Sequence, residues 1–335
     1  MKIAIHNSGS FSPRWIAYCE SHNIDYKIVN VYDCDIVSQL SDCDAVMWHH
    51  HHANYKDVLF AKQLLFSLQM GGKKVFPDFH TGWHFDDKVG EKYLLESIDA
   101  PLVPSYVFYS EKEALNWVNN TIFPKVFKLR GGAGASNVLL AHTPNEAKKF
   151  IKKAFGRGYS QYSPWNNLKE RWRKYRSGNV GFDEVIKGIY RFICKPEFDR
   201  MHGKEKGYVY FQDFMPNNTY DTRIIVIGGK YAFGEKRYVR ENDFRASGSG
   251  VFSYDEVDEN FVKVAFSTAK KIHAQSVAFD FIYDLERNPK IVEISYGFGT
   301  HGVDHCPGYW TSDMQWHEGE GFDFCGWMVE DLINS

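Results

Sequence analysis

Short apolar runs alternate with helical patterns through the first eighty residues of the chain. Runs at 2–6, 26–31, 45–48 and 74–76 are each the length of one strand. Between the last two, residues 58–70 carry apolar side chains at helical spacing and end at Gly71-Gly72, a pair suited to a helix C-cap. Strands that alternate with helices are typical of a parallel sheet with crossover helices. Residues 1–85 are therefore predicted to form a small α/β lobe.

The pattern changes after residue 85. A helix is expected to begin near Asp86-Asp87, because an Asp side chain can cap free backbone N–H groups, and to end before Pro101. Apolar runs at 106–109, 125–129 and 137–141 predict strands. Further helices are expected to open at Ser110-Glu111-Lys112-Glu113, which forms a capping box, and at Thr143-Pro144. Residues 86–207 thus read as an α+β lobe.

Residues 152–200 of this lobe are rich in Lys and Arg interleaved with aromatic residues, most densely at 169–176. This composition is typical of a solvated helical insert that covers a neighbouring lobe. It is also a composition that can bind RNA, so both interpretations stay open at this point.

Strand patterns dominate from residue 208 to the C-terminus. They lie at 208–214, 222–227, 230–238, 278–283 and 290–295, and one helix is expected at 258–274, with its apolar side chains on one face. Residues 227–230 and 283–289 have the composition of hairpin turns. Residues 208–335 are predicted to form a third lobe that ends in a C-terminal cap.

Composition narrows the classes of function. The 335 residues contain 40 Lys and Arg against 42 Asp and Glu, so the chain lacks the basic surplus typical of proteins that bind nucleic acid. No apolar run reaches the roughly 20 residues of a membrane span. The first residues read as a strand rather than a secretory signal, so we expect a cytoplasmic protein. Six cysteines without CxxC spacing suit reduced thiols better than disulfides or a zinc site.

A lysine followed by a loop of small residues is the first candidate for chemistry. The strand at 125–129 delivers Lys128, and residues 131–136 read Gly-Gly-Ala-Gly-Ala-Ser. Small residues let backbone N–H groups approach an anion while the ammonium balances its charge, so phosphate is the expected ligand. The spacing fits neither the Walker loop nor a dinucleotide-binding turn. Taken alone, the segment is equally compatible with a glycine-rich hairpin that exposes its lysine.

Two acids on neighbouring strands are the second candidate. Asp280 and Glu293 lie in apolar runs joined by a tight turn. Paired antiparallel strands can bring opposed residues to within about 5.5 Å on one face. Burying two anions is costly without a cation, and carboxylate oxygens suit Mg²⁺ held between protein and nucleotide phosphates. The alternative is that each strand points its carboxylate to solvent.

Six motifs in order resemble those of the ATP-grasp superfamily, which contains D-alanine:D-alanine ligase, glutathione synthetase and the enzymes that add glutamate to protein tails. They are Asp87-Lys88 followed by a helix and Pro101; residues 123–128 with the glycine-rich loop; residues 210–216, similar to the hinge strand at the adenine pocket; residues 221–226; Arg237, Arg240 and residues 242–250; and Asp280 with Glu293. The resemblance covers residues 86 to about 300. It departs at Ser295, where the family commonly has Asn, and at Asp213, where Glu is usual.

The resemblance implies an ATP-grasp fold of α/β and α+β lobes, with a Rossmann-like pre-ATP-grasp domain at 1–85. Residues 86–207, with the insert 152–200, would be the small lobe, and 208–335 the large lobe with the metal site. The implied nucleotide-binding residues are Lys88, Lys128, Gly131, Gly132, Gly134, Ser136, Gln212, Asp213, Phe214, Met215 and Asp221. The implied catalytic residues are Arg223, Arg240 and Arg245, and the implied metal ligands are Asp280, Glu293 and Ser295. Asp221 is assigned to the ribose, and Gln212 and Asp213 to the adenine through their backbone groups.

The activity implied is ADP-forming ligation of a small carboxylate to an amine or a thiol, through an acylphosphate. ATP and Mg²⁺, or Mn²⁺ in its place, would be the cofactors. A nucleotide-binding protein without turnover is the alternative that Ser295 and Asp213 favour. Neither a membrane nor a nucleic acid is expected as a partner, and a homodimer is left open.

Histidine-rich and aromatic loops complete the candidates. His49-His50-His51-His52 follows a strand at the end where α/β sheets place ligands, and it reads as a solvated loop, a substrate contact or a metal ligand set. Residues 297–305 follow the strand that carries Glu293 and could form the wall of an acceptor site or pack as a cap. Ser295 and His301, or Asp304 and His305, would suit a hydrolase only weakly, because the chain has no Gly-x-Ser-x-Gly elbow.

Overall fold

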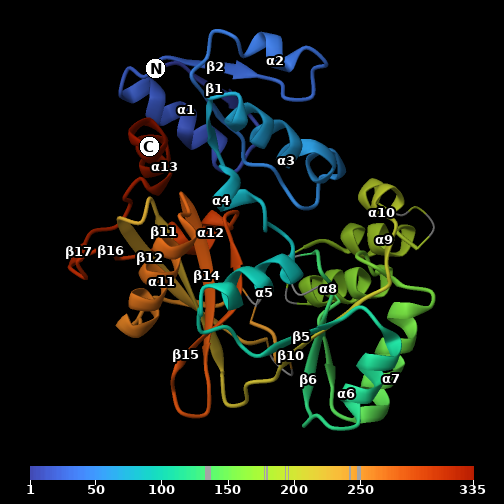
Figure 1. The fold of residues 1–335 in the computed structure, drawn as a ribbon. Helices are drawn as coiled ribbons and strands as arrows, with labels where there is room; N and C mark the ends of the chain where they lie inside the picture. The colour runs from blue at the N-terminus through green and yellow to red at the C-terminus, as the bar shows by residue number, and fades with distance from the viewer. Residues whose placement is uncertain are drawn as a thin grey trace.

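The computed structural model describes residues 1–132, 137–176, 178, 180–192, 194, 196–240, 243–246 and 250–335. Three parts follow one another along the chain (Figure 1): an N-terminal sheet, a middle lobe, and a C-terminal sheet whose last helix returns to the N-terminal part.

The N-terminal part is a four-stranded parallel sheet in the order β2-β1-β3-β4. Its strands are β1 (Ile3–His6), β2 (Tyr26–Val29), β3 (Ala45–Met47) and β4 (Lys74–Phe76), and its helices are α1 (Ser12–Ser21), α2 (Ile36–Gln39), α3 (Tyr55–Met70) and α4 (Phe79–Gly82). All four predicted strands are present. The predicted helix at 58–70 begins earlier, at Tyr55, because the Asn54 side chain caps it by accepting a hydrogen bond from the Lys56 N–H.

The middle lobe is built on a four-stranded sheet in the order β5-β10-β6-β7. Its elements are α5 (Lys88–Ser97), β5 (Ser105–Phe108), α6 (Glu111–Val118), β6 (Lys125–Lys128), β7 (Leu139–Ala141), α7 (Pro144–Phe155) and β10 (Val209–Asp213). The caps predicted from Asp87, Ser110 and Thr143 are formed as expected. Because β10 pairs with β5 and β6, residues 209–213 extend this sheet beyond residue 207. The predicted domain boundaries otherwise stay predictions.

Helices make up most of the described residues of the insert. Its elements are β8 (Tyr159–Ser160), α8 (Pro164–Arg176), α9 (Phe182–Tyr190) and α10 (Glu197–His202), and β8 pairs with β9 (Lys204–Glu205), which follows the insert. α8 packs against α9, and an ion pair joins Arg171 of α8 to Glu184 of α9.

The C-terminal part is a seven-stranded antiparallel sheet. Six strands follow the order β15-β14-β11-β12-β16-β17, and β13 also pairs with β12. Its elements are β11 (Tyr220–Ile227), β12 (Tyr231–Tyr238), β13 (Phe252–Ser253), α11 (Glu259–Ile272), β14 (Ser276–Tyr283), β15 (Pro289–Ser295), α12 (Thr300–Val303), β16 (Gly308–Thr311), β17 (Trp316–Glu318) and α13 (Phe324–Asn334). The predicted turn at 227–230 is formed with Gly228 and Gly229 both in the left-handed region, which costs glycine little.

The two faces of this sheet have different neighbours. α11 buries Phe261, Ala265 and Ile272 against the face that carries Ile224 and Phe279. On the other face, Ile225 and Phe233 join one core with Ile5 and Trp15 of the N-terminal part and with α13. This shared core fixes the N-terminal part to one end of the sheet, and the remainder of the same face carries charged side chains.

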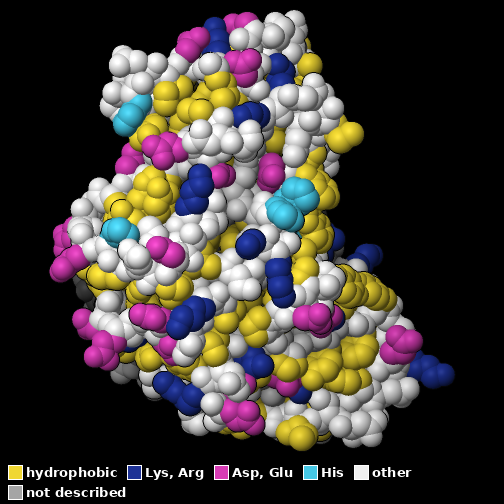
Figure 2. All heavy atoms as spheres, turned by 60° about the vertical axis from the view of Figure 1, so that its left-hand side comes forward, with side chains coloured by type: hydrophobic (Ala, Val, Ile, Leu, Met, Phe, Trp, Pro, Cys, Tyr) yellow, Lys and Arg dark blue, Asp and Glu magenta, His cyan; other side chains and the backbone are white. Residues whose placement is uncertain are grey.

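Among the described residues, no helix has the length and apolarity to cross a membrane. Acidic and basic side chains are interspersed over the face shown in Figure 2. All six cysteines are free thiols, as expected from their spacing.

Candidate active site

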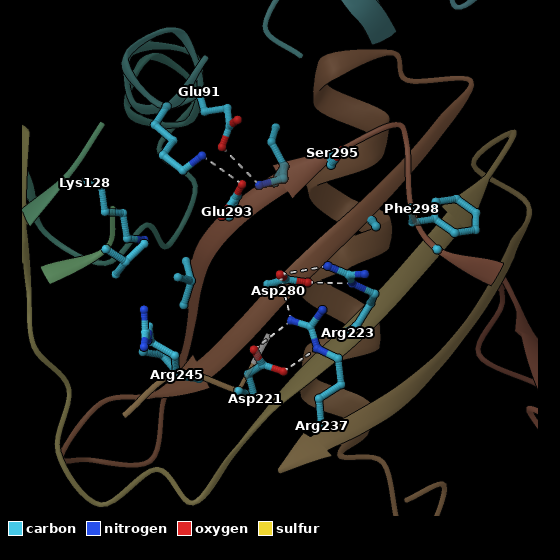
Figure 3. A pocket seen from close by; sticks show the side chains of 18 of the residues that line it. Glu91, Lys128, Asp221, Arg223, Arg237, Arg245, Asp280, Glu293, Ser295 and Phe298 are labelled. Carbon is cyan, nitrogen blue, oxygen red and sulfur yellow. Dashed lines mark hydrogen bonds and ion pairs between the residues drawn. The ribbon is translucent and has the colours of Figure 1, made fainter. Parts of the chain in front are cut away.

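One cleft of about 590 Å³ receives side chains from all three parts of the chain. Lys88 and Lys128 come from the middle lobe, and Asp280 and Glu293 come from the C-terminal sheet. The cleft therefore brings together the lysines and the acids that the sequence singled out (Figure 3).

Most of the predicted site residues line this cleft. They are Lys88, Lys128, Gly132, Gln212, Asp213, Phe214, Met215, Asp221, Arg223, Arg245, Asp280, Glu293 and Ser295. Gly131 and Arg240 are not among the lining residues, although the N–H of Arg240 donates to the carbonyl of Arg245. Gly134 and Ser136 lie outside the described residues.

Both lysines are buried and held by side chains of the cleft. Lys128 ends β6, is 6% exposed, and donates from Nζ to Gln212 Oε1 at 2.7 Å. Burial lowers the pKa of Lys128 to about 8, so the ammonium still predominates at neutral pH. Lys88 opens α5; its Nζ lies 3.1 Å from Glu293 Oε1 and 3.0 Å from the Gly132 carbonyl. Burial alone would lower the pKa of Lys88, but Glu293 and other acids hold it above its usual value.

A hydrogen bond holds the start of the glycine-rich loop against Asp86, which lies just before α5. The Gly132 N–H donates to Asp86 Oδ1 at 2.8 Å, and Gly132 adopts a φ of +100°, which favours glycine. A Cβ on Gly131 would lie 3.1 Å from Asp86 Oδ2 and nearer still to the Gln161 side chain, so the backbone passes closely here. Burial raises the pKa of Asp86 to about 6. Residues 133–136 lie outside the described part of the chain.

Strand β10 places the predicted hinge residues along the cleft. The Gln212 side chain accepts from Lys128 and donates to Ser105 Oγ at 3.1 Å, and Asp213 forms an ion pair with Lys125. The N–H of Asp213 donates to the Pro104 carbonyl at 2.9 Å, so the structure does not leave this group for the adenine contact expected of it. The reason is that the chain entering β5 runs beside β10 at this point. Phe214 and Met215 follow the strand and line the cleft.

Two arginines and two acids form a network on the floor of the cleft. The Arg223 guanidinium donates two hydrogen bonds, of 2.8 and 3.0 Å, to the Asp280 carboxylate. The Arg237 guanidinium donates two hydrogen bonds of 2.7 Å to the Asp221 carboxylate, and its Nη2 atom also lies 2.8 Å from Asp280 Oδ2 (Figure 3). Burial alone would raise the pKa of Asp280, but these arginines hold it well below its usual range. Both oxygens of Asp221, assigned from the resemblance to the ribose, are engaged by Arg237 in this structure.

Asp280 and Glu293 offer carboxylate oxygens of the kind that bind Mg²⁺, but arginines engage both oxygens of Asp280. Asp280 and Glu293 are direct partners in the ladder of β14 and β15, and 32% of the Glu293 side chain is exposed. Ser295, two residues further along β15, donates its hydroxyl to the Gly297 carbonyl at 2.7 Å and keeps oxygen lone pairs. Within the described ranges no three His, Cys, Asp or Glu residues form a metal-binding group. An oxygen set of two carboxylates suits Mg²⁺, which takes its remaining ligands from waters and phosphates.

Two glutamates of the cleft were not predicted from the sequence. Glu91 lies one turn after Lys88 on α5, is 3% exposed, and accepts a hydrogen bond from the Ile294 N–H at 3.3 Å. Burial and the nearby Glu293 raise its pKa well above the usual range. Its spacing from Lys88 is the signal that could have revealed it, since residues three apart share a helix face. Glu235 lies on β12 beside Arg223, and only the strand register brings it to the cleft.

The histidine run is less exposed than a solvated loop would be. His49 stacks on Phe11 with ring centroids 4.1 Å apart, and His50 packs against Tyr296 and Phe85. The solvated-loop interpretation is therefore wrong for His49 and His50, because the shared core with the C-terminal sheet covers them. Burial lowers the pKa of His49 to about 3 and that of His52 to about 4, which keeps both neutral.

Residues 297–305, the loop after β15, were expected either to form the wall of an acceptor site or to pack as a cap, and part of this loop lines the cleft. Phe298, Gly299, His301 and Gly302 line the cleft, and His49, His51 and His52 line it from the N-terminal part.

Comparisons with known proteins identify the fold. Residues 185–309 match the family model of the RimK-like ATP-grasp domain. No curated protein matches the chain. Among solved structures, a RimK domain ATP-grasp protein from Sphaerobacter thermophilus DSM 20745 is 12% identical with a TM-score of 0.55, over 99% of this chain and 100% of that one. The D-cycloserine synthetase DcsG is 12% identical with a TM-score of 0.60, over 99% of both chains. D-alanine–D-alanine ligase from Bacillus anthracis, complexed with ATP, is 12% identical with a TM-score of 0.55, over 100% of this chain and 98% of that one.

These similarities establish the class of fold. The chain has the ATP-grasp fold, and the resemblance noted in its sequence motifs is confirmed. Within that fold, its residues 185–309 are similar to the RimK-like branch.

Proposed function

We propose that this protein is an ATP-dependent, ADP-forming ligase that joins a small carboxylate to an amine through an acylphosphate. The observation that carries the proposal is the single cleft in which Lys88 and Lys128 face Asp280 and Glu293. Phosphoryl transfer needs little covalent chemistry from a protein, and it depends on positioning the reactants and neutralising charge. Two buried ammonium groups opposite two acids supply both requirements.

Each group of residues has a distinct task in this proposal. Lys88 and Lys128 bind phosphate oxygens, and Gly131 and Gly132 let the backbone at the start of the glycine-rich loop approach them. Asp280 and Glu293, with Ser295 beside them, hold Mg²⁺, which supplies charge neutralisation on the phosphates when bound. Arg223 and Arg245 stabilise negative charge on the transferring phosphoryl group and on the substrate carboxylate, and Arg240 positions Arg245 through its backbone hydrogen bond. Phe214 and Met215 would contact the base beside Gln212 and Asp213. Asp221 would face the ribose only if it leaves its hydrogen bonds with Arg237.

Structural neighbours support the type of reaction without defining the substrates. Two of the solved proteins are called a D-alanine–D-alanine ligase and a D-cycloserine synthetase, and the ligase structure contains ATP. We extend to this chain only the reaction class, because substrate contacts differ among proteins that share a fold.

The direct test is a screen of carboxylates with the purified protein, Mg²⁺ and ATP. Hydroxylamine is added as a small nucleophile that traps an acylphosphate as a hydroxamate. We expect one class of carboxylate to give ADP and hydroxamate together, and Glu293→Gln to abolish both while keeping a native circular dichroism spectrum. Full turnover in Glu293→Gln would contradict the proposal.

A nucleotide-binding protein without turnover is the second candidate. It is favoured by Asp280, whose two oxygens are both engaged by arginines, and by Ser295 at the position where the resembling family commonly has Asn. This candidate predicts that ATP binds while no carboxylate of the screen elicits ADP release.

A further inference from the structure

A row of four charged residues crosses the floor of the cleft. Glu293, Asp280, Arg223 and Glu235 are successive partners in the ladders that join β15, β14, β11 and β12. Directly paired residues share one face of a sheet, so all four belong to the cleft side. Adjacent strands lie about 4.8 Å apart, which puts Glu235 about 14 Å along the row from Glu293. Glu293 and Asp280 form the metal end of the row, and Glu235 marks the opposite end.

Glu235 is a buried acid whose charge is not matched. It is 2% exposed, and its Oε2 atom has no hydrogen-bond partner in the part of the chain that the structure describes. Its neighbours Arg223 and Arg237 donate side-chain hydrogen bonds to Asp280 and Asp221 instead. A buried carboxylate is costly unless a cation or a donor meets it, so an unmatched one on a cleft floor indicates a ligand that brings positive charge.

The packing around Glu235 makes room for this carboxyl group. A Cβ on Gly302 of α12 would overlap Glu235 Oε2, so the helix can approach only because residue 302 is glycine. The Tyr254 hydroxyl donates to the Gly302 carbonyl and holds the helix in place. Phe298, His301 and Phe252 line the same cleft. Aromatic rings together with a carboxylate form the chemistry that recognises an ammonium group.

We propose that the Glu235 end of the cleft binds the ammonium form of the amine substrate and that Glu235 takes one proton from it. This inference rests on the ligase function proposed above and names its acceptor subsite. An amine is protonated at neutral pH and has no lone pair with which to attack, so a base must act before the second step of ligation. The acyl group would extend from the metal end of the row toward Glu235, so that the amine can contact both the acyl carbon and the Glu235 carboxylate.

The proposed step balances in atoms and electrons. The Glu235 carboxylate accepts a proton from the ammonium group, which leaves a lone pair on nitrogen. That lone pair forms the C–N bond to the acyl carbon, and the C–O bond to the phosphate breaks with its electrons on the leaving oxygen. The departing phosphate takes the second N–H proton, and Glu235 releases its own proton to water.

The electrostatic surroundings suit this proton exchange. Burial raises the pKa of Glu235 to about 7; Asp280 and Asp221 also raise it, while Arg223 and Arg237 lower it. The segments packed against Glu235 contribute three further titratable groups. Its charge helps to raise the pKa values of Tyr254 and Cys306, and His301 lies on the adjoining α12. A base whose pKa lies near the working pH can both accept and release a proton.

The experiment compares two nucleophiles with one carboxylate, chosen as the best substrate of the hydroxylamine screen. Hydroxylamine is uncharged at neutral pH and needs no base, whereas alkylamines and amino-acid amides arrive as ammonium ions. We expect Glu235→Gln to lower kcat/KM for the best of these amines by about 100-fold or more. Hydroxamate formation should change by less than about threefold, since uncharged hydroxylamine needs neither the contact of Glu235 with an ammonium group nor the removal of a proton before it attacks. Glu286→Gln, in an exposed turn, is the matched control and should leave both reactions as in the wild type.

A second variant, Gly302→Ala, tests the same inference if Glu235→Gln fails to fold. Gly302→Ala keeps the charge of Glu235 but displaces its carboxyl group, so the same selective loss of the amine reaction is expected. Equal losses with both nucleophiles, no loss, or a wild type that forms hydroxamate but accepts no amine would each overturn the inference. A wild type that yields neither ADP nor hydroxamate would instead refute the ligase function itself.

Discussion

Arg237 is the residue whose removal should destabilise the cleft floor most. Its guanidinium makes three charge-assisted contacts of 2.7, 2.7 and 2.8 Å with Asp221 and Asp280, and it is 5% exposed. In Arg237→Met the two acids share Arg223 alone, so one buried negative charge is left without compensation. Breaking a buried ion pair by removing one partner costs about 3 to 5 kcal/mol. We expect the free energy of unfolding to fall by that amount at pH 8.

The same variant should respond to pH in a defined direction. Burial already raises the pKa of Asp221, and Arg237 opposes that rise, so its removal should raise the pKa further. The folded variant then binds a proton that the unfolded chain does not, and its stability should increase as the pH falls from 8 toward 5. The double variant Asp221→Asn with Arg237→Met removes both partners and keeps the pair of Arg223 with Asp280, so most of the loss should be recovered.

Urea unfolding followed by circular dichroism measures these free energies. The wild type, both single variants and the double variant form a double-mutant cycle. A loss below about 1 kcal/mol in Arg237→Met would refute the reasoning, because that is the range of an exposed ion pair. Strictly additive losses in the double variant would refute the coupling between Arg237 and Asp221.

Three further predictions concern other residues of the structure. Lys128→Met should weaken ATP binding by about 10- to 100-fold in equilibrium dialysis, because a buried charge-assisted hydrogen bond to phosphate is lost. An unchanged affinity for ATP would show that Lys128 does not bind the nucleotide. His84 is buried with its pKa lowered to about 3, so only the unfolded chain gains its proton between pH 7 and 5, and this should cost the wild type about 2 kcal/mol of stability. His84→Phe should lose that share of the pH dependence in urea melts, and an identical pH profile would contradict the burial. Gly234→Ala should lower the free energy of unfolding by about 1 to 3 kcal/mol, since the added Cβ would overlap the Arg223 carbonyl oxygen; a neutral effect would contradict this packing.

Several features of the fold and the site were accessible from the sequence because they depend on local pattern. The strands that carry Lys128, Asp280 and Glu293 are short apolar runs bounded by turn residues, and these runs fix strand positions to within about two residues. The cap of α5 by Asp87 follows from side-chain chemistry at a helix start. Local rules therefore placed the lysines and the acids on the correct elements.

Other features depend on contacts between distant segments. The pairing of Arg223 with Asp280 and of Arg237 with Asp221 follows from the register of β11, β12 and β14, which no local motif encodes. The burial of His49 depends on Phe11 and on the C-terminal sheet, more than two hundred residues away in the chain. β10 reads as a strand, but the pairing that places it in the middle sheet is set by β5 and β6.

The central claim is that one cleft holds a triphosphate between two lysines and a magnesium ion bound by two acids. Titration calorimetry of ATP, with and without Mg²⁺, on the wild type and Glu293→Gln tests it most directly. The account predicts that Mg²⁺ strengthens ATP binding to the wild type, and that Glu293→Gln still binds ATP but gains little from Mg²⁺. ATP affinity that is independent of Mg²⁺ in the wild type, or an unchanged Mg²⁺ effect in Glu293→Gln, would contradict it.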